Sequence, residues 1–90
     1  MKLQDALFNW LQIRVVSDAR PDDRSAQDTA SFFQEILTVD HRVTDLRYGK
    51  EQGMYWLSYA AEGKEMNQRY DAEAVESLLE AIQNEPKYNQ

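Results

Sequence analysis

Between residues 54 and 70, apolar and polar residues alternate, and this period of two predicts a β-hairpin. Glu62 and Gly63 fit its two-residue turn, because glycine readily takes the positive φ that such turns require. In the resulting register four pairs share a mostly apolar face: Tyr55 with Tyr70, Leu57 with Gln68, Tyr59 with Met66, and Ala61 with Lys64. The opposite face carries Met54, Trp56, Ser58, Glu65, Asn67 and Arg69. A shift by one residue would exchange the two faces, so the pattern favours this register.

A shorter alternation at residues 43–48 predicts a third strand, placed before the hairpin. The polar segment 49–53 has a glycine at each end and is predicted to be the connecting loop. A four-residue loop pairs Leu46 with Tyr55 and keeps Tyr48 on the apolar face. A five-residue loop pairs Leu46 with Trp56 instead. We favour the four-residue loop. The chain thus predicts a three-stranded antiparallel meander over residues 43–48, 54–61 and 64–70.

Apolar residues three and four positions apart predict helices over residues 3–17, 24–38 and 72–84. In the first helix the apolar arc covers more than half of the circumference, which is wider than a surface helix needs. Such a helix lies either in the middle of the fold, between the sheet and a neighbouring helix, or against a second chain. Phe8 and Val15 lie at the margin of this arc.

Short polar side chains mark the helix starts. Ser25, with Asp28 three residues later, resembles a capping box for the second helix, and Asp22 is an alternative cap. Asp71 is the expected cap of the third helix. A proline ends that helix, and residues 85–90 are expected to fray.

The predicted order of elements is α-α-β-β-β-α, an α+β fold in which helices pack on one face of the sheet. Residues 1–90 are expected to form a single small domain. One buried cluster is predicted, made of the residues on the apolar faces of helices and strands: Leu7, Leu11, Phe33, Ile36, Leu57, Val75, Leu79 and Ile82.

The formal charge of −6, from 16 acids and 10 bases, disfavours binding to nucleic acid or to an anionic membrane. The absence of cysteine excludes disulfides and thiolate zinc sites, and it fits a reducing cytoplasm. No apolar run approaches the roughly 20 residues of a membrane span. We therefore expect a cytoplasmic protein with no nucleic acid or membrane partner.

Few residues are candidates for a catalytic, cofactor-binding or metal-binding role. His41 is the only histidine, and its neighbour Asp40 points elsewhere on an extended chain, so a structural role is expected. The acids within residues 18–23 are interleaved with Arg20 and Arg24 and lack the spacing of a calcium loop. All three glycines are assigned to hairpin turns, which leaves no glycine-rich phosphate loop. No catalytic, cofactor-binding or metal-binding residue is therefore assigned.

Trp56 is the large aromatic residue that the register leaves on the polar face, beside Arg69 on the next strand. Arg69 is expected to stack over the indole, and Trp56 is expected to be partly accessible to solvent. Tryptophan, methionine and arginine are enriched in the cores of protein interfaces. The candidate interaction patch consists of Trp56, Arg69, Met54 and Phe8.

These features favour a small non-catalytic protein that acts through contacts with another protein, or with a second copy as a homodimer. The alternative is a small-ligand-binding or regulatory domain, with a tyrosine-lined pocket between helices and sheet. A third hypothesis is an enzyme of unknown type, which needs an acid–base pair at a cleft. No cofactor is implied by any motif.

Overall fold

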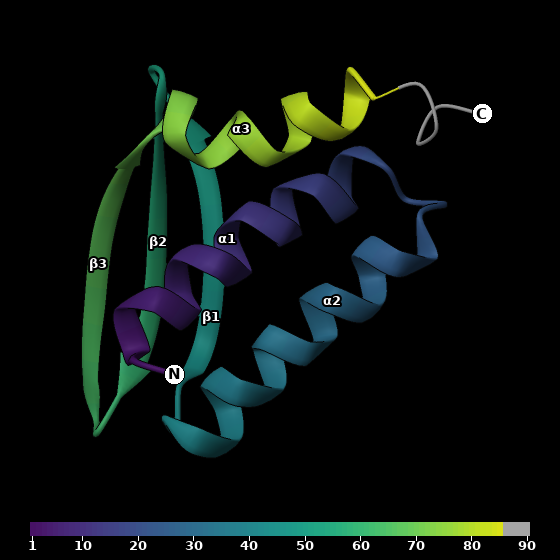
Figure 1. Cartoon of the computed structure of the whole chain (residues 1–90). Coiled ribbons are helices and arrows are strands. Elements are labelled where there is room, and N and C mark those ends of the chain that lie inside the picture. Colours follow the sequence, from purple (N-terminus) through teal and green to yellow (C-terminus); the bar gives the residue numbers. More distant parts are fainter. Residues whose placement is uncertain (86–90) are drawn as a thin grey trace.

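The computed structural model describes residues 1–85 of the chain. Three helices and a three-stranded antiparallel sheet follow one another in the predicted order, which confirms the α+β class. The elements are α1 (Leu3–Ala19), α2 (Arg24–Glu35), the π-helical turn η1 (Ile36–Asp40), β1 (Thr44–Glu51), β2 (Met54–Ala61), β3 (Lys64–Asp71) and α3 (Ala72–Gln83). All three helices lie on the same side of the sheet (Figure 1). The fraying predicted at the end of the chain falls on residues beyond those described, apart from residue 85.

The predicted register of the β2–β3 hairpin is confirmed. Trp56 pairs with Arg69, and Leu57 pairs with Gln68 on the opposite face. Glu62 and Gly63 form the turn with φ values of 54° and 76°, so both residues are left-handed, as in a type I′ turn. The alternation of apolar and polar residues therefore correctly predicted which side chains of β2 and β3 lie on each face of the sheet.

The predicted loop between β1 and β2 was wrong. The strands are joined by a two-residue turn, Gln52 and Gly53, with φ values of 52° and 78°, so β1 continues to Glu51. Tyr48 pairs with Leu57 and stays on the apolar face. Glutamine is not among the usual first residues of such turns, and it therefore gave no turn signal in the sequence.

A β-bulge shifts the register within β1. Thr44 pairs with Ala60 while Arg47 pairs with Ser58, so β1 has one residue more than β2 over this stretch. Asp45 takes the left-handed conformation with a φ of 54°, as one residue of a bulge commonly does. Because of the extra residue, Thr44 and Tyr48 lie on opposite faces, contrary to the simple alternation that predicted this strand.

α1 occupies the middle of the fold, as the first of the two expectations for this helix predicted. One side of α1 packs against the sheet, and its other side packs against α2 and α3. The larger buried cluster joins α1 to the sheet: Ala6, Leu7, Trp10, Leu11, Val15, Leu37, Val43, Tyr55, Leu57, Tyr59 and Val75. The smaller cluster joins α1 to α2 and is flanked by α3: Ile13, Val16, Ala26 and Ala30. The wide apolar arc is thus covered within a single chain.

The core prediction was half right. Leu7, Leu11, Leu57 and Val75 are buried, whereas four further residues predicted to be buried are only half-buried: Phe33, Ile36, Leu79 and Ile82. These four lie on α2, η1 and α3. Those elements pack against α1 with one side only, so the flanks of their apolar stripes stay open to solvent.

The caps also differ from the prediction. Asp23, and not Ser25 or Asp22, caps α2: its Oδ1 accepts a hydrogen bond from the backbone N–H of Ala26 at 3.1 Å. This bond and the neighbouring guanidinium of Arg20 lower the pKa of Asp23. Asp71 does occupy the N-cap position of α3, but its side chain makes no capping hydrogen bond.

Candidate interaction surface

The face of the sheet that points away from the helices is here called the outer face, and no helix of residues 1–85 lies over it (Figure 1). Strand β2 runs along its centre and contributes Met54, Trp56, Ser58 and Ala60. The flanking strands contribute mostly polar side chains: Arg47, Glu65, Asn67 and Arg69. An apolar row therefore lies between two polar rows.

The indole of Trp56 lies against β1 at the position of Gly49, the direct cross-strand partner of Trp56. A Cβ atom built on Gly49 would lie 2.5 Å from Cζ2, 2.6 Å from Cε2 and 2.7 Å from Nε1 of the indole. Only glycine leaves room for the ring in this orientation. The assignment of Gly49 to a turn was therefore wrong: it is a strand residue whose missing side chain is replaced by the indole.

The expected stacking of Arg69 over Trp56 is not observed. The indole is turned toward β1, whereas Arg69 lies on β3, on the other side of Trp56. The Arg69 side chain is exposed and makes no ion pair or hydrogen bond within residues 1–85. Trp56 is half-buried, as expected for a partly accessible side chain.

A polar bridge crosses the other half of the outer face. Arg47 Nη2 lies 3.2 Å from Glu65 Oε1, which joins the two outer strands across β2. Ser58, between them, is only 4% exposed and donates to the same oxygen at 3.4 Å. Since both charged side chains are largely exposed, the pair contributes at most about 1 kcal/mol to stability.

Phe8, the fourth residue of the candidate patch, does not lie on the outer face. It belongs to α1, and its ring centroid is 5.7 Å from that of Tyr70, on the face that the helices cover. The structure therefore brings together Trp56, Met54 and Arg69, and it places Phe8 on the opposite side of the sheet.

His41 and the acids near the end of α1 have structural contacts. The His41 ring Nε2–H donates to the carbonyl oxygen of Met1 at 2.9 Å. Arg14 pairs with Asp18 at 3.2 Å, and Arg20 pairs with Asp23 at 3.1 Å. Within the part of the chain that the structure covers, no group of three acids or histidines is arranged to hold a metal ion.

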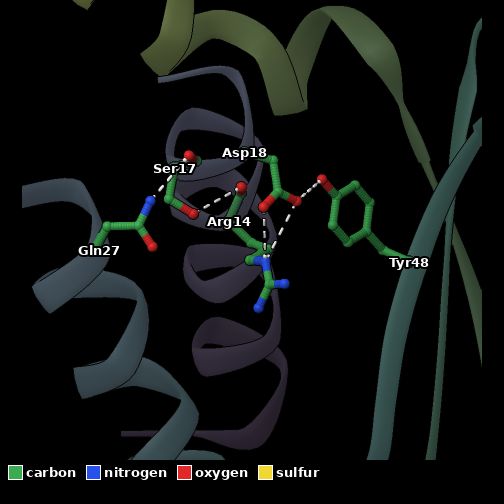
Figure 2. A network of polar contacts seen from close by, with 5 residues as sticks. All are labelled: Arg14, Ser17, Asp18, Gln27 and Tyr48. Atoms are coloured by element: carbon green, nitrogen blue, oxygen red, sulfur yellow. Dashed lines mark hydrogen bonds and ion pairs between the residues drawn. The ribbon is translucent and has the colours of Figure 1, made fainter. Parts of the chain in front are cut away.

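A network around Asp18 joins α1 to the sheet and to α2 (Figure 2). The Tyr48 hydroxyl donates to Asp18, which also accepts from Arg14 Nε. Burial and the neighbouring carboxylate raise the pKa of Tyr48. On the other side of α1, Gln27 Nε2 donates to the backbone carbonyl of Ser17 at 3.1 Å. The network fixes the C-terminal end of α1 from two directions.

A second network joins α3 to the sheet. Glu76 Oε2 accepts a hydrogen bond from the Tyr55 hydroxyl at 2.6 Å and one from Lys50 Nζ at 2.8 Å. The bonds from Lys50 and Tyr55 lower the pKa of Glu76, while burial and the bond to Glu76 raise that of Tyr55 to about 12. The hydroxyls of Tyr59 and Tyr70 both bond to Gln68. The tyrosines expected to line a ligand pocket thus bond to side chains of the chain itself.

Glu76→Gln is expected to make the protein less stable by about 1 kcal/mol at pH 7, because a charge-assisted hydrogen bond becomes a neutral one. The folded-state pKa of Glu76 lies below its ordinary value of 4.5. Its contribution to stability is therefore fully present above pH 4.5 and is lost as the pH falls through the lower folded-state pKa. Urea denaturation from pH 7 to pH 3 should show a smaller acid-dependent loss in the variant. Glu73→Gln, which changes an exposed acid on the same helix, is the control and should keep the wild-type pH dependence.

Comparisons of the chain with protein-family models, with curated proteins and with solved structures gave no match. Among the helices of residues 1–85, none is both long and apolar enough to cross a membrane.

Proposed function

We propose that this protein is non-catalytic and acts through protein–protein contact, and that its outer face binds the outer face of a second copy of the chain. The observation that carries the proposal is Trp56, which lies half-exposed against Gly49 on the central strand of a sheet face that no helix of residues 1–85 covers. A large aromatic side chain in such a place loses further contact with water when a second surface covers it.

The apolar row on β2 has the make-up of an interface centre. Met54 and Trp56 are neighbours on the outer face, Ala60 follows beyond Ser58, and these three apolar residues are each half-buried within one chain. Because the indole lies against the backbone of β1, it is already ordered before a partner arrives. Binding then costs less conformational entropy than it would with a freely rotating side chain.

The charge of the sheet favours a second copy as the partner. The strands and turns of residues 44–71 hold four bases and five acids, a formal charge of −1 out of −6 for the whole chain. Two such faces can approach each other with little net repulsion, and opposite charges are available on both. A nucleic acid would require a positively charged face.

The size of the face predicts a weak dimer. Each strand has eight residues. At about 3.4 Å per residue and about 4.8 Å between strands, the face measures roughly 27 Å by 14 Å. Two copies then bury on the order of 800–1,200 Å² in total once side-chain relief is included, at or below the lower end of stable interfaces. We therefore expect dissociation in the micromolar range.

The test is sedimentation equilibrium from about 5 to 500 μM, a range chosen to span micromolar dissociation. The wild type should pass from monomer to dimer, and Trp56→Ala should raise the dissociation constant at least tenfold, as truncation of a central interface tryptophan does. Phe32→Ala is the matched control, because Phe32 is an aromatic residue on α2, 58% exposed and away from the sheet. It should leave the dimer unchanged.

Gly49→Ala gives a second, independent variant. Its methyl group displaces the indole but leaves Trp56 in the chain, so it should also weaken the dimer while circular dichroism shows an intact fold. A strictly monomeric mass up to 500 μM would overturn the proposal that a second copy covers this face. Equal weakening by Trp56→Ala and Phe32→Ala would do the same.

A further inference from the structure

The helical side of the molecule contains an apolar groove that is separate from the outer face. Its floor is Ile13 of α1, and its walls are Ala26 and Thr29 of α2 and Leu78 and Ile82 of α3. The groove has a volume of about 290 Å³ and opens to solvent. We call it the helix groove.

The helix groove exists because α2 and α3 both pack against α1 from different sides. Ala26 and Ala30 are small and buried, so α2 approaches α1 closely and has little bulk to fill the space toward α3. Leu78 and Ile82 belong to the apolar stripe of α3, yet each remains half-buried. In a folded protein such a stripe is normally buried completely, so this part of the stripe lacks a packing partner within residues 1–85.

Negative charge is concentrated on the elements that form the groove walls. Residues 20–35 and 72–85, which contain α2 and α3, hold eight acids and two arginines, a formal charge of −6. This equals the −6 of the whole chain, whereas the sheet is close to neutral. The carboxylate of Asp23 lies in the lining itself, and its charged form is favoured by its bond to the N–H of Ala26 and by Arg20.

We propose that the helix groove binds an amphipathic helix of another protein, with apolar side chains toward Ile13 and lysine or arginine residues along its flanks. The apolar lining and its helical walls suit helix-in-groove recognition, in which residues at i, i+3 or i+4, and i+7 anchor the ligand. The surrounding acids attract basic flanks. A second copy of this chain would bring a further −6 on the same elements and be repelled, and anionic lipid or nucleic acid is disfavoured in the same way.

The groove is short, which bounds the affinity. Its lining extends over residues 23–29, at the N-terminal end of α2, and over residues 78–82 of α3, which is one to two helical turns or roughly 7–10 Å at 1.5 Å per residue. A bound helix therefore inserts two or three apolar side chains. We expect a dissociation constant on the order of 10–100 μM at low salt, and weaker binding as salt screens the charges.

The experiment uses three synthetic helical peptides of about 16 residues, long enough to be partly helical in water. The first has a leucine stripe with lysine flanks, the second has the same stripe with glutamate flanks, and the third keeps the lysines but replaces the leucines by glutamine. Fluorescence anisotropy should give binding of the first peptide and at least tenfold weaker binding of the other two. Equal binding of the first and third peptides would show that the binding is nonspecific charge attraction, and this result would overturn the proposal.

Variants of the chain locate the binding. Ile82→Ser should weaken the binding of the first peptide at least fivefold. Val39→Ser, at a 65% exposed residue of η1 outside the groove, should leave this binding unchanged. Amide chemical shifts should change around Ile13, Ala26 and Leu78 when the peptide is added, which tests the site in the wild-type protein. Unchanged binding by Ile82→Ser, or shifts confined to the sheet, would contradict the assignment. Trp56→Ala should bind the peptide normally, so this test and the dimer test fail independently.

Discussion

Leu57→Ala is expected to lower the free energy of unfolding by about 2–5 kcal/mol, the range for a fully buried leucine. Leu57 is 0% exposed and lies on β2, the central strand, where it packs in the same cluster as Leu7 and Leu11 of α1. Its neighbours belong to a paired strand and to a helix held on both sides, so the cavity left by the change cannot collapse easily. A domain of this size has a total stability of about 5–15 kcal/mol, so much of it would be lost.

Urea denaturation of Leu57→Ala and Leu79→Ala measures this effect with a matched change. Leu79 was predicted from the sequence to be buried, but α3 leaves it half-buried. Its truncation should therefore cost less than half as much as that of Leu57. Similar losses of stability for the two variants would show that Leu79 is fully buried in solution.

The fold was largely predictable because its main signals are local. The alternation around Leu57 gave the faces of β2, and Gly63 marked the turn that fixes the β2–β3 register. The turn at Gln52 was missed because glutamine is not typical of that position, and the bulge at Asp45 was missed because a single left-handed residue leaves no periodic trace. Both errors concern β1 and its connection to β2, where the predicted alternation over residues 43–48 is the shortest of the three.

The candidate sites were less predictable, because they depend on packing between distant residues. Trp56 could be placed on the outer face from the β2–β3 register alone. Its contact with Gly49 requires the β1–β2 register as well, and that was predicted wrongly. With the correct turn, a glycine directly opposite a tryptophan would have been the signal. The helix groove depends on how α2 and α3 are oriented on α1, which the apolar period of each helix does not encode.

Trp10→Ala is expected to destabilise the protein by about 3–5 kcal/mol, whereas Trp10→Phe should cost only about 1 kcal/mol or less. Trp10 is 2% exposed and packs edge-on against Tyr48, with ring centroids 6.0 Å apart. Its indole N–H is buried and has no hydrogen-bond acceptor among residues 1–85. Alanine removes the whole ring and leaves a cavity between α1 and β1.

The change to phenylalanine should cost less stability, because it keeps an aromatic ring beside Tyr48 and removes the buried N–H donor. A buried donor without an acceptor costs about 1–3 kcal/mol of stability, so its removal stabilises the variant. This stabilisation offsets much of the free energy that is lost because the smaller ring buries less apolar area. Urea denaturation of both variants, with Trp56→Phe as the control at a half-exposed tryptophan, measures the difference. If Trp10→Phe proved as damaging as Trp10→Ala, the indole N–H must have an acceptor in solution, such as a buried water molecule. The ring would then be held by that bond as well as by its packing.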